Sequence, residues 1–337
     1  MRALTLTAPK QFAFVEEAEP SALASDEALI RIHQVGVCGT DVSGYLGKMP
    51  FIQYPRILGH ELGVEVVAVG SDVKNITVGD RCSVEPYLNC GSCPPCRRGL
   101  TNCCESLQVL GVHCDGGLRR LIKVPARKLH PASDLGLEQL ALVETLGIGC
   151  HAVNRSLSRS DETALVIGSG PIGLAVIEFV KAAGVKLHVI EPHERRREYV
   201  REHHRSVRVH ERLAPEELPA ANEGRLADVV FDATGNAASM ARAFEYAAFG
   251  GKVVYVGITT EPVPLNDPLF HRRELTLLAS RNALSADFRY ILDLIRRGVI
   301  NTAPWITHRM KFGEVPEMFP KLLEPGSGVV KAMIEME

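Results

Sequence analysis

The stretch Ala164-Leu-Val-Ile-Gly168-Ser-Gly170-Pro-Ile-Gly173 decides the fold of the second half of this chain. Its first four residues are apolar and suit a short buried strand, and Pro171 then stands where the first turn of a helix accepts proline. Glycines at the first, third and sixth positions of the turn permit a tight bend, close approach of a diphosphate to the backbone, and packing of the helix on the strand. The stretch therefore predicts a strand, a phosphate-binding turn and a helix.

The residues that follow continue the alternation of helices and strands. A helix is expected from Ile172 to Ala183, ended by Gly184, and apolar strands are expected at residues 187–190, 228–232 and 252–257. Such alternation is typical of parallel βαβ units. The fold class is therefore α/β, with a doubly wound parallel sheet in this part of the chain.

Glu191 ends the second expected strand and bears on the choice of cofactor. An acid about twenty residues after the glycine-rich turn accepts hydrogen bonds from the ribose hydroxyls of NAD and repels the 2′-phosphate of NADP. Arg195, Arg196 and Arg197 follow it and favour the opposite choice, because a guanidinium can bind that phosphate. NAD is the expected cofactor, and NADP is the alternative.

Four cysteines, at positions 90, 93, 96 and 104, have the spacing of a structural zinc site. Four thiolates enclose one Zn²⁺ tetrahedrally and leave no open position, so such a site stabilises a loop and does no chemistry. Cys103 adjoins Cys104, and the spacing alone allows a shift of one residue. A redox cluster or a cysteine-rich loop is the alternative interpretation.

Three separated fragments carry ligands for a second, reactive zinc. They are Gly-Val-Cys-Gly-Thr-Asp at 36–41, Gly-His-Glu at 59–61 and Val-Glu-Thr at 143–145. Catalytic zinc takes three protein ligands and keeps one position open. Cys38 and His60 are the expected ligands, and Glu61 and Glu144 compete for the third place. Asp41 is expected to orient His60 through the second ring nitrogen.

Length and composition indicate an ordinary globular protein of two domains. The chain has 337 residues, 46% hydrophobic residues and a formal net charge of −2, which gives no electrostatic reason to bind nucleic acid or an anionic membrane. No stretch resembles a signal peptide or a membrane span, and the remaining cysteines show no pairing pattern, so a cytoplasmic location is expected. Short alternating runs before residue 145 predict a barrel-like β domain. We expect a first domain of residues 1–148 and 284–337, with residues 149–283 inserted as the dinucleotide-binding domain.

Together these motifs resemble the zinc-containing medium-chain alcohol dehydrogenases over essentially the whole chain. The resemblance includes Asp232-Ala-Thr-Gly235 and implies a GroES-like β-barrel catalytic domain beside a Rossmann domain. Within the superfamily the chain is similar to the polyol and sugar-acid branch, and several segments resemble bacterial enzymes of the L-galactonate 5-dehydrogenase type. Those segments are residues 54–60, 101–105, 111–117, 267–274 and 280–282.

The resemblance also implies roles for individual residues. Family spacing selects Cys104 as the fourth ligand of the structural site, and Thr40 is the hydroxyl that begins proton removal. Glu144 often acts through a water in polyol dehydrogenases, with Glu61 as a direct ligand. Arg281 and His113 are expected to contact the substrate. The expected cofactor contacts are Gly168, Gly170, Pro171, Ile172, Gly173, Glu191, Arg196, Thr234, Gly257, Ile258, Arg281 and Asn282.

Two departures from the family pattern concern the proton path and one local turn. Ser43 stands where family members commonly carry a histidine that passes the proton toward solvent, and Thr145 stands in place of the family's proline within the third fragment. Neither change removes an expected metal ligand.

The expected reaction is reversible oxidation of a secondary alcohol of a polyol or a sugar acid such as L-galactonate, with hydride passing to NAD. Two zinc ions per chain are expected, one catalytic and one structural. A threonine dehydrogenase or a simple alcohol dehydrogenase is the alternative enzyme, and a catalytically silent NAD-binding sensor or structural protein is the alternative outside enzymes. A homodimer or homotetramer is expected, with the edge strand near Val253–Ile258 paired across subunits.

Overall fold

The computed structural model describes residues 1–156 and 161–336. The chain divides into two compact units, Met1–Glu144 with Leu284–Glu337, and Thr145–Ala283. This boundary and the expected one at residue 148 both fall inside helix α3 (Leu137–Ser156).

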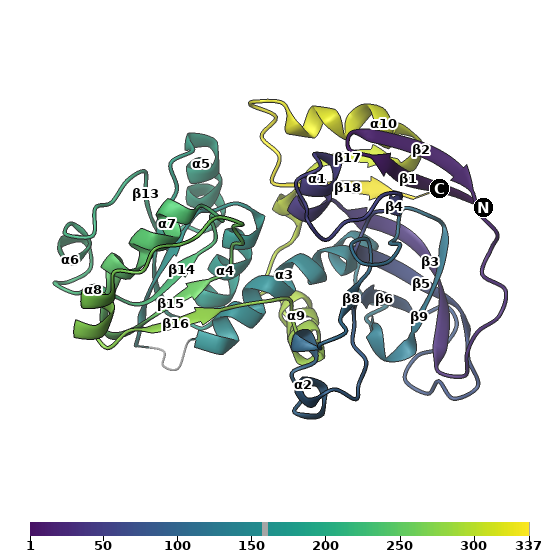
Figure 1. The fold of residues 1–337 in the computed structure, drawn as a ribbon, viewed down its shortest axis with the longest axis horizontal. Coiled ribbons are helices and arrows are strands. Elements are labelled where there is room, and N and C mark those ends of the chain that lie inside the picture. Colours follow the sequence, from purple (N-terminus) through teal and green to yellow (C-terminus); the bar gives the residue numbers. More distant parts are fainter. Residues whose placement is uncertain (157–160, 337) are drawn as a thin grey trace. The chain divides into compact units, whose positions relative to one another are not determined.

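The first unit is rich in β-structure, as the sequence predicts (Figure 1). Among the described residues its largest sheet has the order β10-β6-β5-β3-β18-β17, with β9 paired to β3. The strands are β3 (Glu27–Gly36), β5 (Glu61–Val69), β6 (Arg81–Val84), β9 (Leu121–Pro125), β10 (Leu129–Pro131), β17 (Ile306–Lys311) and β18 (Lys331–Glu335).

Smaller elements complete this unit. A second sheet has the order β2-β1-β4, and strands β7 and β8 form a separate antiparallel pair. Their bounds, with those of the helices, are β1 (Arg2–Ala8), β2 (Gln11–Glu16), β4 (Arg56–Ile57), β7 (Tyr87–Leu88), β8 (Gln108–Val109), α1 (Gly39–Tyr45), α2 (Pro94–Arg97), α9 (Ser285–Arg296) and α10 (Val315–Met318).

Strand β3 shows why the sequence folds this way. Ala28, Ile30 and Ile32 alternate with less buried residues, so that one face of the strand joins the core. At its end, Gly36 pairs with Glu61 of β5 and with Met333 of β18. A Cβ atom at Gly36 would lie 2.1 Å from Oε2 of Glu61, so glycine is required there for the carboxylate to occupy its place.

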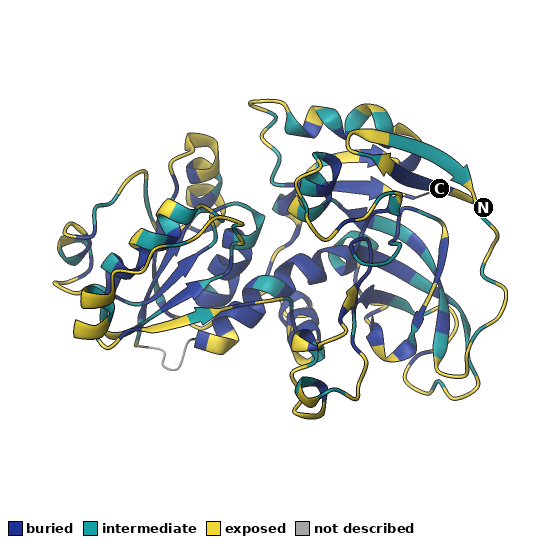
Figure 2. Cartoon of the chain, in the orientation of Figure 1, coloured by how far each residue is buried: buried dark blue, intermediate teal, exposed yellow. Residues whose placement is uncertain are grey.

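The second unit is a parallel sheet with the order β13-β12-β11-β14-β15-β16 in the part of the chain that the structure describes. The central strand β11 is buried at every residue, and α4 contacts both β11 and β12 (Figure 2). The elements are β11 (Thr163–Ile167), β12 (Lys186–Ile190), β13 (Arg208–His210), β14 (Ala227–Asp232), β15 (Ala247–Tyr255), β16 (Thr276–Ala279), α4 (Pro171–Ala182), α5 (Glu194–His203), α6 (Leu218–Ala221), α7 (Ala237–Arg242) and α8 (Asp267–Arg272).

An apolar cluster holds the elements of this unit together. Phe244 is buried and makes edge-to-face ring contacts with Tyr255 and Phe270, at centroid distances of 6.1 and 5.8 Å. Truncating such a side chain to alanine costs about 3–5 kcal/mol, because it leaves a cavity that the neighbours fill only in part.

The prediction of an edge strand near Val253–Ile258 is wrong. Strand β15 pairs with β14 on one side and with β16 on the other, so β16 is the edge on this side of the sheet. Strand β16 consists of only Thr-Leu-Leu-Ala after a charged helix end, and so short a run gives a weak strand signal.

Candidate metal centre and dinucleotide site

Three expected zinc ligands lie together in the first unit. Cys38 is the N-cap residue of α1, His60 precedes β5, and Glu61 is the first residue of that strand. A sulfur, a ring nitrogen and a carboxylate oxygen from these residues lie within 4.8 Å of one another. His60 and Glu61 are buried, and Cys38 is partly exposed, so the group has both a protein side and an accessible side.

Asp41 joins the two segments that carry these donors. Its Oδ2 accepts a hydrogen bond from the Cys38 amide at 2.8 Å, and its Oδ1 accepts one from the Gly59 amide at 3.4 Å. The same Oδ1 lies 3.7 Å from Nδ1 of His60, which is beyond hydrogen-bond distance. Among the described residues this buried nitrogen has no hydrogen-bond partner. Asp41 therefore lies close to the ring nitrogen that the sequence predicted as its partner. It acts on His60 as a nearby negative charge and not through a hydrogen bond.

The two competing carboxylates have different partners. Both oxygens of Glu61 accept hydrogen bonds from Nζ of Lys331, at 2.6 and 2.9 Å. Glu144 lies outside the three-donor group, and one of its oxygens accepts a hydrogen bond from the Tyr87 hydroxyl. Glu61, Glu144, Lys331 and Tyr87 are all buried. The sequence analysis missed Lys331 and Tyr87 because neither belongs to a ligand motif.

The charges of this centre favour a bound cation. Burial by itself lowers the pKa of His60, but the carboxylate of Asp41 and the sulfur of Cys38 outweigh it and hold that pKa well above its ordinary value. Burial raises the pKa of Glu144, opposed by His60 and by the Tyr87 hydroxyl. Thiolate, imidazole and carboxylate are donors that zinc accepts in open sites. The residues therefore fit a catalytic zinc ion.

The remaining residues expected near this centre are only partly placed by contacts. Thr40 lies in the first turn of α1, half-buried, and Ser43 lies in the same helix. His113 accepts a hydrogen bond from the Val109 amide at Nδ1, 3.1 Å away, and its ring lies 6.0 Å from the exposed ring of Phe51. The hydrogen bond assigns the proton of a neutral His113 to Nε2.

The four-cysteine group is formed by Cys90, Cys93, Cys96 and Cys104, whose sulfurs lie within 4.8 Å of one another. Cys103 is exposed and outside the group. Amides of Ser92 and Cys93 donate to the Cys90 sulfur at 3.4 and 3.3 Å and lower the pKa of that thiol to about 6. Such donors favour the thiolate that zinc requires.

The glycine-rich turn of the second unit has the predicted geometry. Gly168 has a φ of +88°, and a Cβ at Gly173 would lie 1.9 Å from the Gly168 carbonyl oxygen, so both positions require glycine. Pro171, Ile172 and Gly173 form the first turn of α4, which puts free backbone N–H groups beside the turn.

Glu191 is more heavily bonded than the sequence suggests. Its Oε2 accepts hydrogen bonds from the amide and the hydroxyl of Ser169, at 2.8 and 3.1 Å, and its Oε1 accepts one from the His193 amide at 2.9 Å. A carboxylate offers about four acceptor positions, so about one remains for a ribose hydroxyl. Glu191 thus fixes the glycine-rich turn as well as facing the ligand site.

A cavity of about 710 Å³ lies at this turn. Of the expected cofactor residues, Gly168, Gly170, Glu191, Arg196 and Thr234 line it. The sequence analysis missed other residues that line it, although several follow strand β13 or β14, where the carboxyl ends of parallel strands form such sites. They include His193, Arg212, Leu213, Asn236, Ser239, Arg242 and Tyr246.

Seven expected cofactor residues do not line this cavity: Pro171, Ile172, Gly173, Gly257, Ile258, Arg281 and Asn282. Gly257 and Ile258 follow strand β15. A Cβ at Gly257 would lie 2.4 Å from the Gly235 nitrogen, so the loop after β15 contacts the loop after β14. Ile258 is 80% exposed. Arg281 is exposed, and Asn282 has a left-handed φ of +54°.

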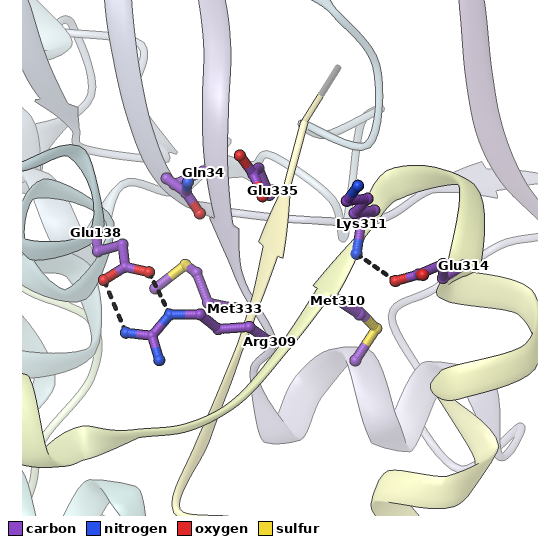
Figure 3. A pocket seen from close by; sticks show the side chains of 8 residues that line it. All are labelled: Gln34, Glu138, Arg309, Met310, Lys311, Glu314, Met333 and Glu335. Atoms are coloured by element: carbon purple, nitrogen blue, oxygen red, sulfur yellow. Dashed lines mark hydrogen bonds and ion pairs between the residues drawn. The ribbon is translucent and has the colours of Figure 1, made fainter.

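A second cavity, of about 240 Å³, lies in the first unit and contains none of the expected site residues (Figure 3). Glu138 and Arg309 form a two-bond ion pair in it, at 2.7 and 3.0 Å, and the Lys311 amide donates to Glu314. Gln34, Met310, Met333 and Glu335 complete its lining.

Comparison with known proteins identifies the family. A family model described as the alcohol dehydrogenase GroES-like domain matches residues 24–134, and one described as a zinc-binding dehydrogenase matches residues 171–297. The L-galactonate-5-dehydrogenase of Escherichia coli K12 is 36% identical over 341 residues, covering 99% of this chain and 98% of the relative. An L-arabinitol 4-dehydrogenase of Aureobasidium melanogenum is 33% identical over 98% of this chain and 95% of its own. The chain therefore belongs to the zinc-type medium-chain alcohol dehydrogenases.

Solved structures agree with this assignment. A dehydrogenase, rspB, from Escherichia coli CFT073, solved in complex with NADH, superposes with a TM-score of 0.91 at 26% identity, covering 99% of both chains. The predicted GroES-like and Rossmann domains are confirmed. Within the family, the relatives place this oxidoreductase among the polyol and sugar-acid dehydrogenases. None of the described helices combines the length and apolarity that a membrane span requires.

Proposed function

We propose that this protein oxidises a secondary alcohol of a sugar acid or polyol, with NAD as the hydride acceptor and a zinc ion at Cys38, His60 and a glutamate. The observation that carries the proposal is the buried cluster of thiolate, imidazole and carboxylate, which is partly accessible through Cys38. When bound there, zinc would supply Lewis acidity toward the alcohol oxygen.

The names of the relatives support the substrate class. L-galactonate-5-dehydrogenase and the 2-dehydro-3-deoxy-L-galactonate 5-dehydrogenase of Pseudoalteromonas atlantica are named for acting on sugar acids, and the arabinitol enzymes for acting on a polyol. An L-galactonate-like aldonate is our first choice of substrate. Arg281 is proposed to bind the carboxylate of this substrate through bidentate hydrogen bonds from its guanidinium. His113 is proposed to donate a hydrogen bond from Nε2 to a substrate hydroxyl.

The chain's own residues have the following proposed roles in the reaction. Thr40, two residues after Cys38, accepts a hydrogen bond from the substrate hydroxyl at Oγ1 and releases its own proton toward solvent as it takes up the substrate's proton. Glu144 holds negative charge beside the donors, and Lys331 offsets that of Glu61. The glycine-rich turn and the residues around Glu191 fix the dinucleotide so that its reactive ring has one orientation.

NAD is the proposed cofactor because the Glu191 carboxylate is fixed at the cavity by three hydrogen bonds. A fixed negative charge disfavours a 2′-phosphate. Arg196, Arg212 and Arg242 also line the cavity and act in the other direction, so the test must include both cofactors.

The test is a panel of aldonates, uronates, alditols and threonine, each with NAD and with NADP, read as the rate of reduced-nicotinamide formation. We expect an aldonate or alditol with NAD to give the highest kcat/KM, and elemental analysis to give two zinc ions per chain. Metal confined to the four-cysteine site would exclude the catalytic metal centre. A preference for threonine, or no turnover in any combination, would contradict the proposed substrate class.

We also propose a cytoplasmic homo-oligomer that pairs through the β16 edge. Leu277 on that strand is 42% exposed, and Phe249 is 70% exposed. Leu277→Lys is expected to lower the mass measured by light scattering, while Val78→Lys, an exposed apolar position in the other unit, leaves it unchanged. Equal masses for both variants would contradict pairing at β16.

A further inference from the structure

The hydrogen bond between Tyr87 and Glu144 connects the metal centre to a part of the chain that carries no ligand for it. The Tyr87 hydroxyl donates to Oε1 of Glu144, and the two side chains are nearly inaccessible, at 2% and 4% exposure for the residues. Within the described residues, no other hydrogen bond to this carboxylate is found. The position of Glu144 therefore depends on where Tyr87 is held.

Tyr87 is held by the strand pair from which the four-cysteine segment extends. It pairs with Val109, and Leu88 pairs with Gln108. Strand β7 ends at Leu88, shortly before Cys90, and strand β8 begins at Gln108, shortly after Cys104, so the two strands form the base of the segment. Asn89, between the strand and the first cysteine, donates to the Cys96 sulfur and accepts a hydrogen bond from Arg127. A metal that closes the four-cysteine site also holds this base together.

The ring of Tyr87 is fixed from its other side by aromatic packing. Phe288 meets it edge to face, with centroids 6.4 Å apart, and Phe288 itself stacks on His130 at 4.9 Å. Nε2 of His130 lies 3.3 Å from Glu85, and Glu85 also accepts hydrogen bonds from Lys128 and Ser285. A ring held in this way gives its hydroxyl one position.

We propose that Tyr87 is a positioning residue that couples the four-cysteine segment to Glu144 and keeps one carboxylate oxygen bonded, so that the other oxygen serves the metal centre. This inference rests on the proposed function, because it needs a cation at Cys38 and His60. It gives the structural zinc segment a part in arranging the reactive centre, in addition to closing a loop. No step of the reaction passes through Tyr87.

The test replaces Tyr87 with Phe, which keeps the ring and removes the hydroxyl. The readouts are the visible absorption of the protein with Co²⁺ in the catalytic site and the zinc affinity of that site, measured with a competing chelator. We expect a changed cobalt spectrum and about tenfold weaker zinc binding, because a hydrogen bond to a charged group is lost. Tyr255→Phe is the control, since Tyr255 donates a hydrogen bond to a main-chain oxygen of Met240 in the other unit.

Coupling to the four-cysteine segment is read from a double-mutant cycle with Cys90→Ser. We expect Cys90→Ser to change the catalytic-site cobalt spectrum in the parent protein and to add little in the Tyr87→Phe background. If the spectral effects of the two substitutions are fully additive, the proposed coupling is overturned. If Cys90→Ser does not fold, Tyr87→Phe alone decides, and an unchanged spectrum with unchanged zinc affinity overturns the inference. Failure of the proposed function is distinguishable, because the parent protein would then oxidise no member of the substrate panel while its cobalt spectrum still responds to Tyr87→Phe.

Discussion

Replacing Lys331 with Met removes the positive charge that faces Glu61. Lys331 is 2% exposed, and its Nζ donates to both Glu61 oxygens and to the main-chain oxygen of Val37, at 3.2 Å. Burial lowers the pKa of Lys331, but the charge of Glu61 outweighs this and raises the pKa above its ordinary value. The lysine is therefore charged, and methionine keeps most of its volume without that charge.

The expected cost depends on whether a metal ion is bound. Breaking a buried ion pair by removing one partner costs about 3–5 kcal/mol, because the other charge stays buried and unpaired. In the metal-loaded protein a divalent cation among Cys38, His60 and Glu61 compensates Glu61, so we expect a loss of about 1–2 kcal/mol. By thermodynamic linkage the difference of about 2 kcal/mol appears as roughly 30-fold tighter zinc binding in Lys331→Met.

The assay is urea unfolding of both proteins with the four-cysteine site loaded, with and without metal in the second site, together with a chelator competition for zinc. Lys252→Met is the control, because Lys252 forms a partly buried ion pair with Glu162 in the second unit, which carries none of the metal-site donors. The control should destabilise both metal states equally. If Lys331→Met also lowers the free energy of unfolding equally in both states, Glu61 does not share its charge with a cation, and the reasoning is refuted.

Three further predictions concern the second unit. Burial, with His210, Arg208 and Lys186 nearby, lowers the pKa of His188 from 6.5 to about 4, so His188 stabilises the fold fully above the unfolded value and less as the pH falls toward 4. Between pH 7 and about 5, the free energy of unfolding should fall by about 1–2 kcal/mol less in His188→Gln than in the parent protein. Urea unfolding at both pH values measures this difference, and His271→Gln, at an exposed position, is the control. Gly173→Ala should weaken NADH binding at least tenfold, since its Cβ meets the Gly168 carbonyl oxygen at 1.9 Å, whereas Gly136→Ala should not, as fluorescence titration would reveal. Glu191→Ala should reduce the ratio of kcat/KM for NAD over NADP by more than Glu211→Ala, which changes another acid of the same cavity; an unchanged ratio would remove Glu191 from cofactor choice.

The sequence predicted the parts of the site that lie in short continuous motifs. The glycine-rich turn is readable because its steric demands fall on residues three to six positions apart, and the structure shows the close approach of Gly173 to Gly168. The cysteine spacing is readable for the same reason, and the structure brings together the four sulfurs that the family spacing selected.

The sequence could not predict partners that meet through the folding of distant strands. Lys331 is 270 positions from Glu61, and Tyr87 is 57 positions from Glu144. Each contact depends on strand order and register, which local patterns do not determine. The misplaced sheet edge has a similar cause, since the four residues of β16 give little signal before the sheet is assembled.

The partners of Glu61 and Glu144 act in opposite directions on the competition for the metal. Glu61 lies within the donor group, but Lys331 already neutralises its charge, so its attraction for a cation is reduced. Glu144 lies outside the group, and its hydrogen bond comes from the uncharged Tyr87 hydroxyl, so among the described residues no cationic side chain forms an ion pair with it. Proximity thus favours Glu61 as a ligand, and net charge favours Glu144. Loss of Lys331 should move the balance toward Glu61, and loss of the Tyr87 hydroxyl should free Glu144 to move, so the two variants distinguish which carboxylate completes the site.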